Sequence, residues 1–436
     1  MNEMMAKVFF DQIHICDPST GRDEVSALII NDGMVEAVGS PQEIGAAPSD
    51  ATIIRADDAV LAPGLIDIRV QSRTPGYAHK ENPTSLAKAA AAGGITSMVC
   101  LPNTDPVLDN PDSLAALTRY DRNSQADAMP RIYAYGAATR GLDNIAMAEL
   151  GLLAEAGAVG FTNATMPIAD SLVMRRIMDY AAMLDKPVIQ HAEDMSLSAG
   201  GEMHEGENST RLGLKGIPAE AEEIVVARDL SLVRLTGARY HVAHVSCGRT
   251  IALIRAAKEE GLPVTCDTAP PYFALNDIAT MQYDTRFQLS PPLRSEEDRQ
   301  AIIAGIADGT IDCIASDHAP QDRDSKLLPF GIAATGASAL ETLMAMVLGL
   351  YHQGHISLLK AIDLMSTTPA TLLDLPGGTL APGAVADMVV VAPERGWQIR
   401  GSAFHSLSQS TPFEGQPVQG KVLSTWVAGQ MIFEAE

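Results

Sequence analysis

Three polar residues with the chemistry of a metal site follow three separate apolar runs of the sequence. His191 and His244 each stand at the end of a run, and Asp317 follows a third. Imidazole nitrogens and carboxylate oxygens are ligands of catalytic zinc, and a nearby carboxylate can carry a proton. A lone histidine at a strand end is more commonly a structural hydrogen-bonding group. The matching positions of the three residues, more than their types, predict a shared site.

A fourth apolar run has the pattern of a metal-binding strand but lacks residues that could bind a metal. The segment from Pro63 to Gln71 reads PGLIDIRVQ, and Arg69 and Gln71 share one face if it is a strand. Two histidines at these positions would hold a divalent ion. A guanidinium is permanently charged and has no lone pair for a metal, and an amide oxygen is a poor substitute for imidazole. We therefore expect this strand to bind no metal.

Short apolar runs separated by amphipathic stretches must position these residues. We expect strands at Leu65–Val70, Thr96–Leu101, Arg131–Tyr135, Val159–Thr162, Pro187–His191, Tyr240–Val245, Pro263–Asp267 and Cys313–Ser316. Helices are expected at Thr84–Ala92, Asp143–Ala156, Ser171–Leu184, Ala219–Leu235, Gly248–Glu260 and Ser295–Asp308. Strand and helix units in this series favour an α/β fold, a (β/α)₈ TIM-like barrel with its active site at the C-terminal ends of the strands. An open doubly wound sheet is the alternative.

Both ends of the chain have the pattern of β-structure. The short runs are Lys7–Phe10, Ala27–Ile30, Met34–Val38, Met388–Val391 and Val422–Val427. Neither end has enough apolar surface to fold alone, so we expect the two to pair into one small β-sandwich. The predicted domains are this composite β-sandwich, residues 1–60 with 380–436, and a barrel of residues 61–379.

Composition narrows the partners and the compartment. The formal net charge is −23, which disfavours nucleic acid and anionic membrane surfaces. The five cysteines form no CxxC pair, which is typical of core thiols in a reducing compartment. No secretory leader or membrane span is recognised. We expect a cytoplasmic homo-oligomer that binds neither nucleic acid nor membrane.

Six motifs, in this order, resemble those of the dihydroorotases of the amidohydrolase superfamily. They are PGLID at 63–67, LPNT at 101–104, HAED at 191–194, HVS at 244–246, PPLR at 291–294 and DHAP at 317–320. Hydantoinases and allantoinases share the barrel, but the PNT and PPLR segments resemble the dihydroorotase branch. The resemblance implies an amidohydrolase-type barrel and a place in pyrimidine biosynthesis. The family reaction is the reversible hydrolysis of dihydroorotate to N-carbamoyl-aspartate.

The resemblance also implies a metal centre. Its ligands are two histidines on strand one, an acidic or carbamylated group on strand four, histidines on strands five and six, and a proton-shuttling aspartate on strand eight. His191, His244 and Asp317 match and are the expected metal ligands if an ion is bound, with Asp317 as general acid/base or its vestige. Arg69, Gln71 and Asn163 stand at lost-ligand positions, where Asn163 follows the strand-four phenylalanine. In the family the surviving residues belong to two different ions.

Substrate-binding residues are kept in part. Arg73 matches the family arginine that grips the substrate carboxylate, a task suited to its bidentate guanidinium, and Asn103 matches its neighbour. Ser290 replaces an asparagine, and Gln321 replaces a histidine. A surface ion pair is the alternative role for Arg73.

Two interpretations of function remain. The first is a degenerate dihydroorotase homologue without a cofactor; such relatives serve as structural partners of aspartate carbamoyltransferase. The second is an active zinc-dependent dihydroorotase or related cyclic amidohydrolase that uses His191, His244 and Asp317 around one ion, since three ligands and a water are an acceptable zinc shell. A metal-free enzyme of another kind has little support, because no phosphate-binding loop or Gly-x-Ser-x-Gly elbow is present.

The degenerate interpretation makes a structural prediction. If strand one projects Arg69 into the barrel mouth, its fixed charge lies where the ion's charge would be and pairs with Asp317. His241 is offset from His244 by an odd number, so it should face away and be structural. His318 belongs to the DHAP motif and is expected to hydrogen-bond within the site.

Overall fold

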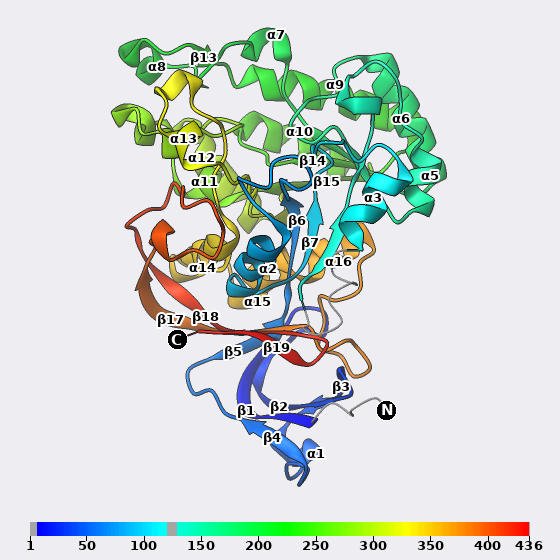
Figure 1. The fold of residues 1–436 in the computed structure, drawn as a ribbon, viewed down its shortest axis with the longest axis vertical. Coiled ribbons are helices and arrows are strands. Elements are labelled where there is room, and N and C mark those ends of the chain that lie inside the picture. The colour runs from blue at the N-terminus through cyan, green and yellow to red at the C-terminus, as the bar shows by residue number, and fades with distance from the viewer. Residues whose placement is uncertain (1–6, 120–128, 436) are drawn as a thin grey trace.

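Eight parallel strands form a closed barrel in this computed structural model, which describes residues 7–119 and 129–435. In order they are β6 (Leu65–Val70), β7 (Ile95–Cys100), β8 (Arg131–Ala134) continued by β9 (Gly136–Ala137), β10 (Phe161–Thr162), β11 (Val188–His191), β14 (Tyr240–Ala243), β15 (Val264–Thr268) and β16 (Cys313–Ile314). A parallel bridge between Val70 and His318 joins the last strand to the first. The ring is therefore closed, which confirms the barrel and excludes the open sheet (Figure 1).

Helices cover the outside of the barrel and short elements surround its mouth. The helices are α2 (Pro83–Ala92), α3 (Pro111–Thr118), α5 (Leu150–Glu155), α6 (Ser171–Met183), α7 (Met195–Ser198), α8 (Glu207–Leu212), α9 (Glu220–Thr236), α10 (Gly248–Glu259), α11 (Pro270–Ala274), α12 (Glu296–Ala307), α13 (Arg323–Lys326), α14 (Leu343–His352), α15 (Leu358–Met365) and α16 (Thr367–Leu373). A small ribbon pairs β12 (Met203–His204) with β13 (Gly216–Ile217). Short 3₁₀ turns are η1 (Arg140–Leu142), η2 (Asp277–Gln282), η3 (Thr285–Phe287), η4 (Phe330–Ile332), η5 (Leu340–Thr342) and η6 (Gly401–Ala403). None of the described helices is long and apolar enough to cross a membrane.

One predicted helix is wrong in its first half. The stretch Asp143–Ala156 was expected to be a single helix, but α5 begins only at Leu150. Leu142 and Asn144 have φ values of 60° and 63°. A left-handed backbone does not propagate a right-handed helix, so the chain turns here before α5 starts. The other five predicted helices are confirmed within a few residues.

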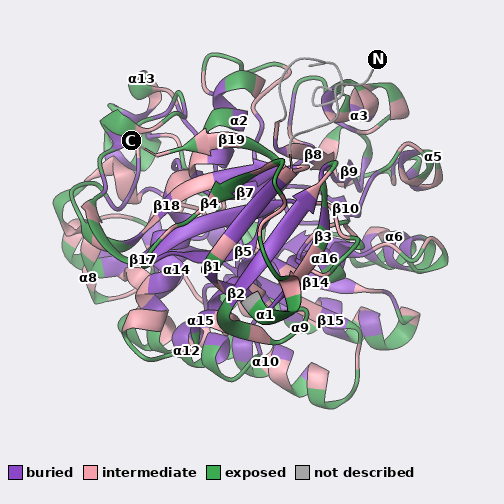
Figure 2. Ribbon diagram, turned by 90° about the horizontal axis from the view of Figure 1, so that it is seen from below, coloured by how far each residue is buried: buried purple, intermediate pink, exposed green. Residues whose placement is uncertain are grey.

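The two ends of the chain share one eight-stranded sheet. Its strands are β1 (Lys7–Asp17), β2 (Arg22–Asn31), β3 (Met34–Gly39), β4 (Ala51–Ile54), β5 (Val60–Pro63), β17 (Met388–Gln398), β18 (Pro417–Val427) and β19 (Gln430–Glu434), with α1 (Pro41–Ile44) beside them. β5 pairs antiparallel with β17, which joins the N-terminal strands to the C-terminal ones. Figure 2 shows β1 mostly buried and β5 fully buried in this sheet, whereas β4 and β19 have no buried residue. The expected pairing of the two ends is confirmed, whereas the exact domain bounds stay a prediction.

The terminal sheet curls back over its own apolar face. Three strand-to-strand steps separate β1 from β18, which would place them roughly 14 Å apart in a flat sheet. The rings of Phe10 on β1 and Trp426 on β18 are nevertheless 5.6 Å apart, edge to face. The apolar side chains of both halves, including Ile13, Leu28 and Met388, form one buried cluster. This closure gives the sheet its sandwich-like core.

Candidate functional site

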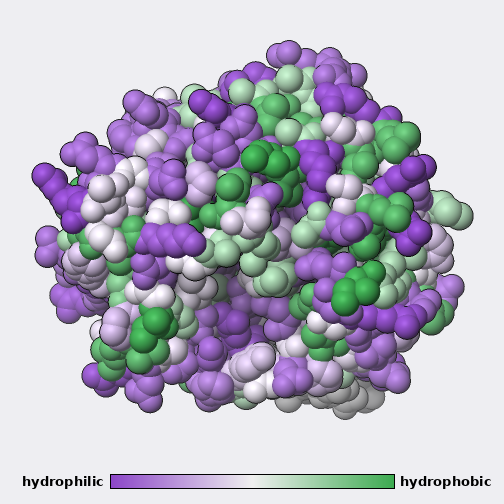
Figure 3. Space-filling model, turned by 90° about the horizontal axis from the view of Figure 1, so that it is seen from above, coloured by the Kyte–Doolittle hydropathy of each residue, from purple (hydrophilic) through white to green (hydrophobic). Residues whose placement is uncertain are grey.

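The predicted site residues meet at the barrel mouth, where the strands end. Arg69 lies near the end of β6, His191 ends β11, and His244 directly follows β14. Asn163 follows β10 and Asp317 follows β16. His244 and Asp317 have φ values of 37° and 55°, which turn the chain sharply at the strand ends. Figure 3 looks onto this face, where hydrophilic side chains line a central hollow.

Arg69 is the centre of the mouth network. Its side chain is 2% exposed, and its Nε donates to Oδ1 of Asp317 at 2.9 Å. One terminal nitrogen lies 3.1 Å from Nε2 of His244 and 3.4 Å from the carbonyl oxygen of Ala164. The predicted contact between Arg69 and Asp317 is therefore confirmed.

The two histidines continue this network as a chain of hydrogen bonds. Nδ1 of His244 lies 3.0 Å from Oδ2 of Asp317, and its Nε2 lies 2.8 Å from Nδ1 of His191. Nε2 of His191 lies 2.8 Å from a carboxylate oxygen of Glu193. Because Arg69 can only donate, Nε2 of His244 accepts and its Nδ1 carries the proton toward Asp317. His191 then donates from Nδ1 to His244, and its Nε2 contacts Glu193.

The electrostatics of the pocket agree with this assignment. Burial and the neighbouring Arg69 lower the pKa of His244 from 6.5 to about 4, so its ring is neutral at physiological pH. Burial acts to raise the pKa of Asp317, but His244 and Arg69 together hold it well below its ordinary value. Burial likewise opposes ionisation of Glu193, whose hydrogen bond with His191 nevertheless lowers its pKa. The mouth thus holds the Arg69–Asp317 ion pair beside the neutral imidazole of His244.

The donor set does not fit a metal ion. Both ring nitrogens of His191 and of His244 are already engaged. Asp317 contacts Nδ1 of His244, whereas His191 faces Nε2, so the three side chains do not surround one point. Arg69 approaches the same Nε2 that an ion would use. Within residues 7–119 and 129–435, no group of three or more His, Cys, Asp or Glu side chains could hold an ion.

Two of the positions predicted to have lost a metal ligand carry amide side chains, and both amides form hydrogen bonds with other residues. The side-chain oxygen of Asn163 accepts from the backbone N–H of Thr139 at 3.0 Å. Its amide nitrogen donates to the Thr139 hydroxyl at 2.9 Å and to the Asn144 side chain at 2.8 Å. The side-chain oxygen of Gln71 accepts from Asn103 at 3.2 Å. Both amides are therefore structural links between loops of the mouth.

The residues expected to bind substrate line a mouth cavity of about 220 Å³, together with Gln71, Ser290, Asp317 and Gln321. Arg73 donates from Nε to the carbonyl oxygen of Pro320 at 3.0 Å, and burial lowers its pKa to about 10. Asn103 reaches the cavity through its link to Gln71. The structure thus brings Arg73 and Asn103 beside Asp317, and their substrate-binding role stays a prediction.

Two further histidines have structural roles. His241 contacts Thr265 and Asp267, each at 2.8 Å, and Asp267 also accepts from the backbone N–H of His244. It faces away from the mouth, as predicted. Nδ1 of His318 accepts from the backbone N–H of Ala339 at 3.2 Å.

Sequence reasoning missed two carboxylates, Glu193 and Glu81. Glu193 was visible as a charge two residues after His191, inside the HAED motif. Glu81 is fully buried, and one of its oxygens lies 3.6 Å from Nε2 of His318. Glu81 also accepts a hydrogen bond from the hydroxyl of Ser406, which is 325 residues away in the sequence. No local sequence pattern indicates such a contact.

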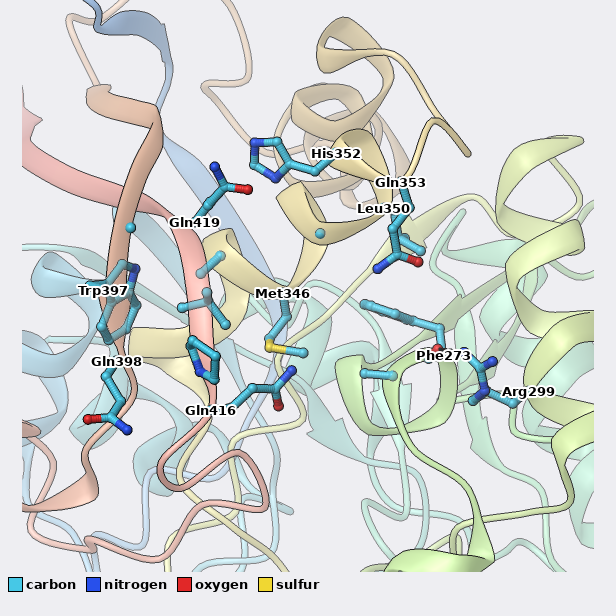
Figure 4. A pocket seen from close by; sticks show the side chains of 16 residues that line it. Phe273, Arg299, Met346, Leu350, His352, Gln353, Trp397, Gln398, Gln416 and Gln419 are labelled. Carbon is cyan, nitrogen blue, oxygen red and sulfur yellow. Dashed lines mark hydrogen bonds between the residues drawn. The ribbon is translucent and has the colours of Figure 1, made fainter.

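A larger cavity, of about 800 Å³, lies away from the mouth between α11, α12, α14 and the β17–β18 hairpin. Figure 4 shows amide side chains such as Gln353 and Gln416 around it, with Phe273 and Trp397 on its walls. Arg299 on its rim is already paired with Glu296. None of the predicted site residues lines this cavity.

The closed barrel with a composite terminal sheet is an amidohydrolase-type fold. L-hydantoinase (dihydropyrimidinase) from Arthrobacter aurescens matches it with a TM-score of 0.86, over 99% of this chain and 96% of its own, at 24% identity. A Dihydro-orotase-like family model matches residues 58–249. The protein of Syntrophus aciditrophicus (strain SB) named dihydroorotase is 40% identical over 99% of this chain and 100% of its own length. The dihydroorotase of Geobacter sp. (strain M21) is 42% identical over 97% of this chain and 98% of its own. This chain belongs to the dihydroorotase family.

Proposed function

We propose that this chain is a dihydroorotase-like protein of pyrimidine biosynthesis that has lost catalysis and acts as a structural partner of aspartate carbamoyltransferase. Relatives named dihydroorotase over nearly the whole chain support the pathway. The loss of catalysis rests on one observation, the Arg69 guanidinium held between Asp317 and His244.

The chemistry of ring opening explains why this observation matters. Hydrolysis of a cyclic amide at neutral pH needs an activated water and a group that accepts its proton. An arginine has no vacant orbital with which to bind and acidify water. Asp317 is ionised, but its oxygens are engaged by Arg69 and His244, and its lowered pKa makes it a weak base. The mouth therefore has a positive charge without the reactivity of a metal.

Catalysis is tested with the purified chain in dihydroorotate ring opening and ring closure, with and without added zinc, alongside elemental analysis. We expect no turnover above that of Asp317→Ala, and zinc far below one ion per chain. Near-stoichiometric zinc together with turnover that disappears in Asp317→Ala would refute the proposal.

The active zinc-dependent enzyme is the second candidate, and one observation favours it. Nδ1 of His191 and Nε2 of His244 face each other at 2.8 Å, as two ligands of one ion would. This function requires Arg69 to leave Nε2 of His244. Titration with Co²⁺ tests it, because an imidazole-bound cobalt absorbs visible light; an unchanged spectrum removes this candidate.

Partnership is tested by co-expression with the aspartate carbamoyltransferase of the same organism, followed by size-exclusion chromatography with light scattering. We expect a single peak that contains both chains. Two separate peaks under mild conditions would contradict the partnership. The same chromatography of this chain alone measures its molar mass and so tests the expected homo-oligomer.

A further inference from the structure

A third cavity, of about 570 Å³, lies between α14, η6 and the strands β17, β18 and β19. Trp397 and Gln398 line both this cavity and the one shown in Figure 4, so the two adjoin at the β17–β18 hairpin. Its volume is within the range of about 300–1,000 Å³ typical of small-molecule sites. No residue of the barrel mouth belongs to it.

Three aromatic side chains form flat apolar walls of this cavity: Trp397, Phe404 and Phe433. The indole N–H of Trp397 donates to the carbonyl oxygen of Gly420 at 3.1 Å, which fixes the ring. Phe433 packs edge to face with His405, with ring centroids 6.0 Å apart. Such walls favour a ligand with a flat apolar body, because aromatic faces stack on flat groups.

Two cations at the same cavity have no acidic partner. The Arg400 side chain donates only to the side-chain oxygen of Gln398, and the Lys421 side chain has neither a hydrogen bond nor an ion pair within the described part of the chain. The chain as a whole has a net charge of −23, whereas these two cations lie together beside one cavity. They favour an anionic ligand, because an ammonium and a guanidinium both bind carboxylate, sulfonate or phosphate oxygens.

The carboxylates at this cavity do not neutralise the cations. Glu341 accepts from the backbone N–H groups of His405 and Ser406 and from the His405 ring, so its oxygens are occupied. Burial also raises its pKa, against the opposing effect of its hydrogen bonds with His405 and Ser406. Glu434 is exposed at the end of β19. One outer carboxylate thus stands against two cations.

We propose that this cavity binds a small organic anion with a flat apolar body. Arg400 and Lys421 hold its anionic group, and Trp397, Phe404 and Phe433 contact its body. The site is independent of the barrel mouth and of the proposed loss of catalysis.

The test uses the full chain carrying Trp426→Phe. The sequence has two tryptophans, so this change leaves Trp397 as the single fluorescent reporter at the cavity. Trp426 packs on Phe10 in the terminal sheet, where a phenylalanine keeps an aromatic ring. The probe is 8-anilinonaphthalene-1-sulfonate, and its neutral counterpart N-phenyl-1-naphthylamine has the same rings without the charge.

We expect the sulfonate to quench Trp397 by energy transfer and to bind more tightly than the neutral probe. The double variant Arg400→Gln, Lys421→Gln should weaken sulfonate binding about tenfold and leave the neutral probe unchanged. The matched control is Arg211→Gln, an exposed arginine on α8 without an ion pair among the described residues, which should change neither.

A second measurement, the salt dependence of probe binding, uses the parent chain and so does not require the double variant to fold. Added salt should weaken binding of the sulfonate to the parent chain and leave the neutral probe unaffected, because exposed charges are screened. The proposal is overturned by absence of quenching at Trp397, by equal affinity for the two probes, or by an unchanged sulfonate affinity in a folded double variant.

Discussion

Arg69 carries a permanent charge in a position where water scarcely reaches it. A buried charge is stable only with a partner and with hydrogen bonds to its remaining donors. Asp317 supplies the partner, and His244 and the Ala164 carbonyl accept from one terminal nitrogen. The other terminal nitrogen has no hydrogen-bond partner within the described residues. The arrangement therefore depends on Asp317 more than on any other neighbour.

Substitution of Arg69 by methionine should destabilise the fold by about 3–5 kcal/mol, because it leaves the partly buried Asp317 with only His244 as partner. Urea denaturation measures the change. The matched control Arg73→Met loses one bond to the Pro320 carbonyl and should cost about 1 kcal/mol. Equal effects of the two substitutions would contradict the role given to Arg69.

Acid should destabilise the protein through His244. Its pKa is about 4 in the folded chain against 6.5 ordinarily, so between these values only the unfolded chain takes up the proton. Stability is present above pH 6.5 and is lost as the pH falls to about 4, by on the order of 3 kcal/mol. The lowered pKa of Asp317 adds a further loss only below its ordinary range.

Buried Asp67 and Asp229 act in the opposite direction, since burial raises the pKa of each to about 6. The measurement is therefore the difference in unfolding free energy between the parent chain and His244→Gln from pH 7 to pH 4, in which the contributions of distant groups such as Asp67 and Asp229 cancel. A difference that stays constant across this range would show that His244 does not titrate as described.

At the scale of elements, the loops after β9 and β10 are held together by one amide. Asn163 accepts from the Thr139 backbone and donates to Thr139 and Asn144. An acidic residue at this position could not make the two donated bonds. The residue that stands at the predicted lost-ligand position of strand four therefore also joins these two loops.

The nearly isosteric change Asn163→Asp should destabilise the chain by about 2–4 kcal/mol, because two buried donors are lost and a charge is buried beside the Asn144 oxygen. Thermal and urea unfolding both measure it. The second change Asn144→Lys would supply a cation and should recover part of the loss. A neutral effect of Asn163→Asp would indicate that the loops are held by other contacts.

The whole molecule is a barrel on a sheet that needs both chain ends. β17 lies in the middle of the terminal sheet, between β18 and β5, and β5 leads through Gly64 into the first barrel strand. A Cβ on Gly64 would lie 2.3 Å from the Thr96 side chain, so sheet and barrel meet in close contact there.

Removal of residues 380–436 should leave a chain that aggregates, because it takes away Met388 and Trp426 and so uncovers β5 and the rest of the apolar cluster around Phe10. Removal of 430–436, the edge strand and its end, should leave a folded chain of lower stability. Soluble yield and size-exclusion profiles distinguish the two. A monodisperse, cooperatively unfolding chain ending at 379 would show that the barrel folds alone.

The periodicity of apolar residues and the polar residues at strand ends determine much of this fold from the sequence alone. All eight barrel strands, five of six helices and the pairing of the two chain ends were predictable, because they follow from local apolar patterns and from the need of each end for apolar cover. The prediction of a helix at 143–156 was wrong in its first half because the backbone has positive φ at Leu142 and Asn144. The pattern of apolar side chains does not indicate these backbone angles. The pairing of Arg69 with Asp317 followed from residue type and strand position.

Only the tertiary structure decided how these residues use their hydrogen bonds. The direction of His191 toward His244, the bond from His191 to Glu193, and the closure of Asn163 on Asn144 join residues through the orientation of rings and amides. The cavity beside Trp397 likewise joins residues from α14, η6 and three strands. A sequence states which donors and acceptors exist, but their pairing depends on distances of about 3 Å between segments far apart in the chain, which packing alone determines.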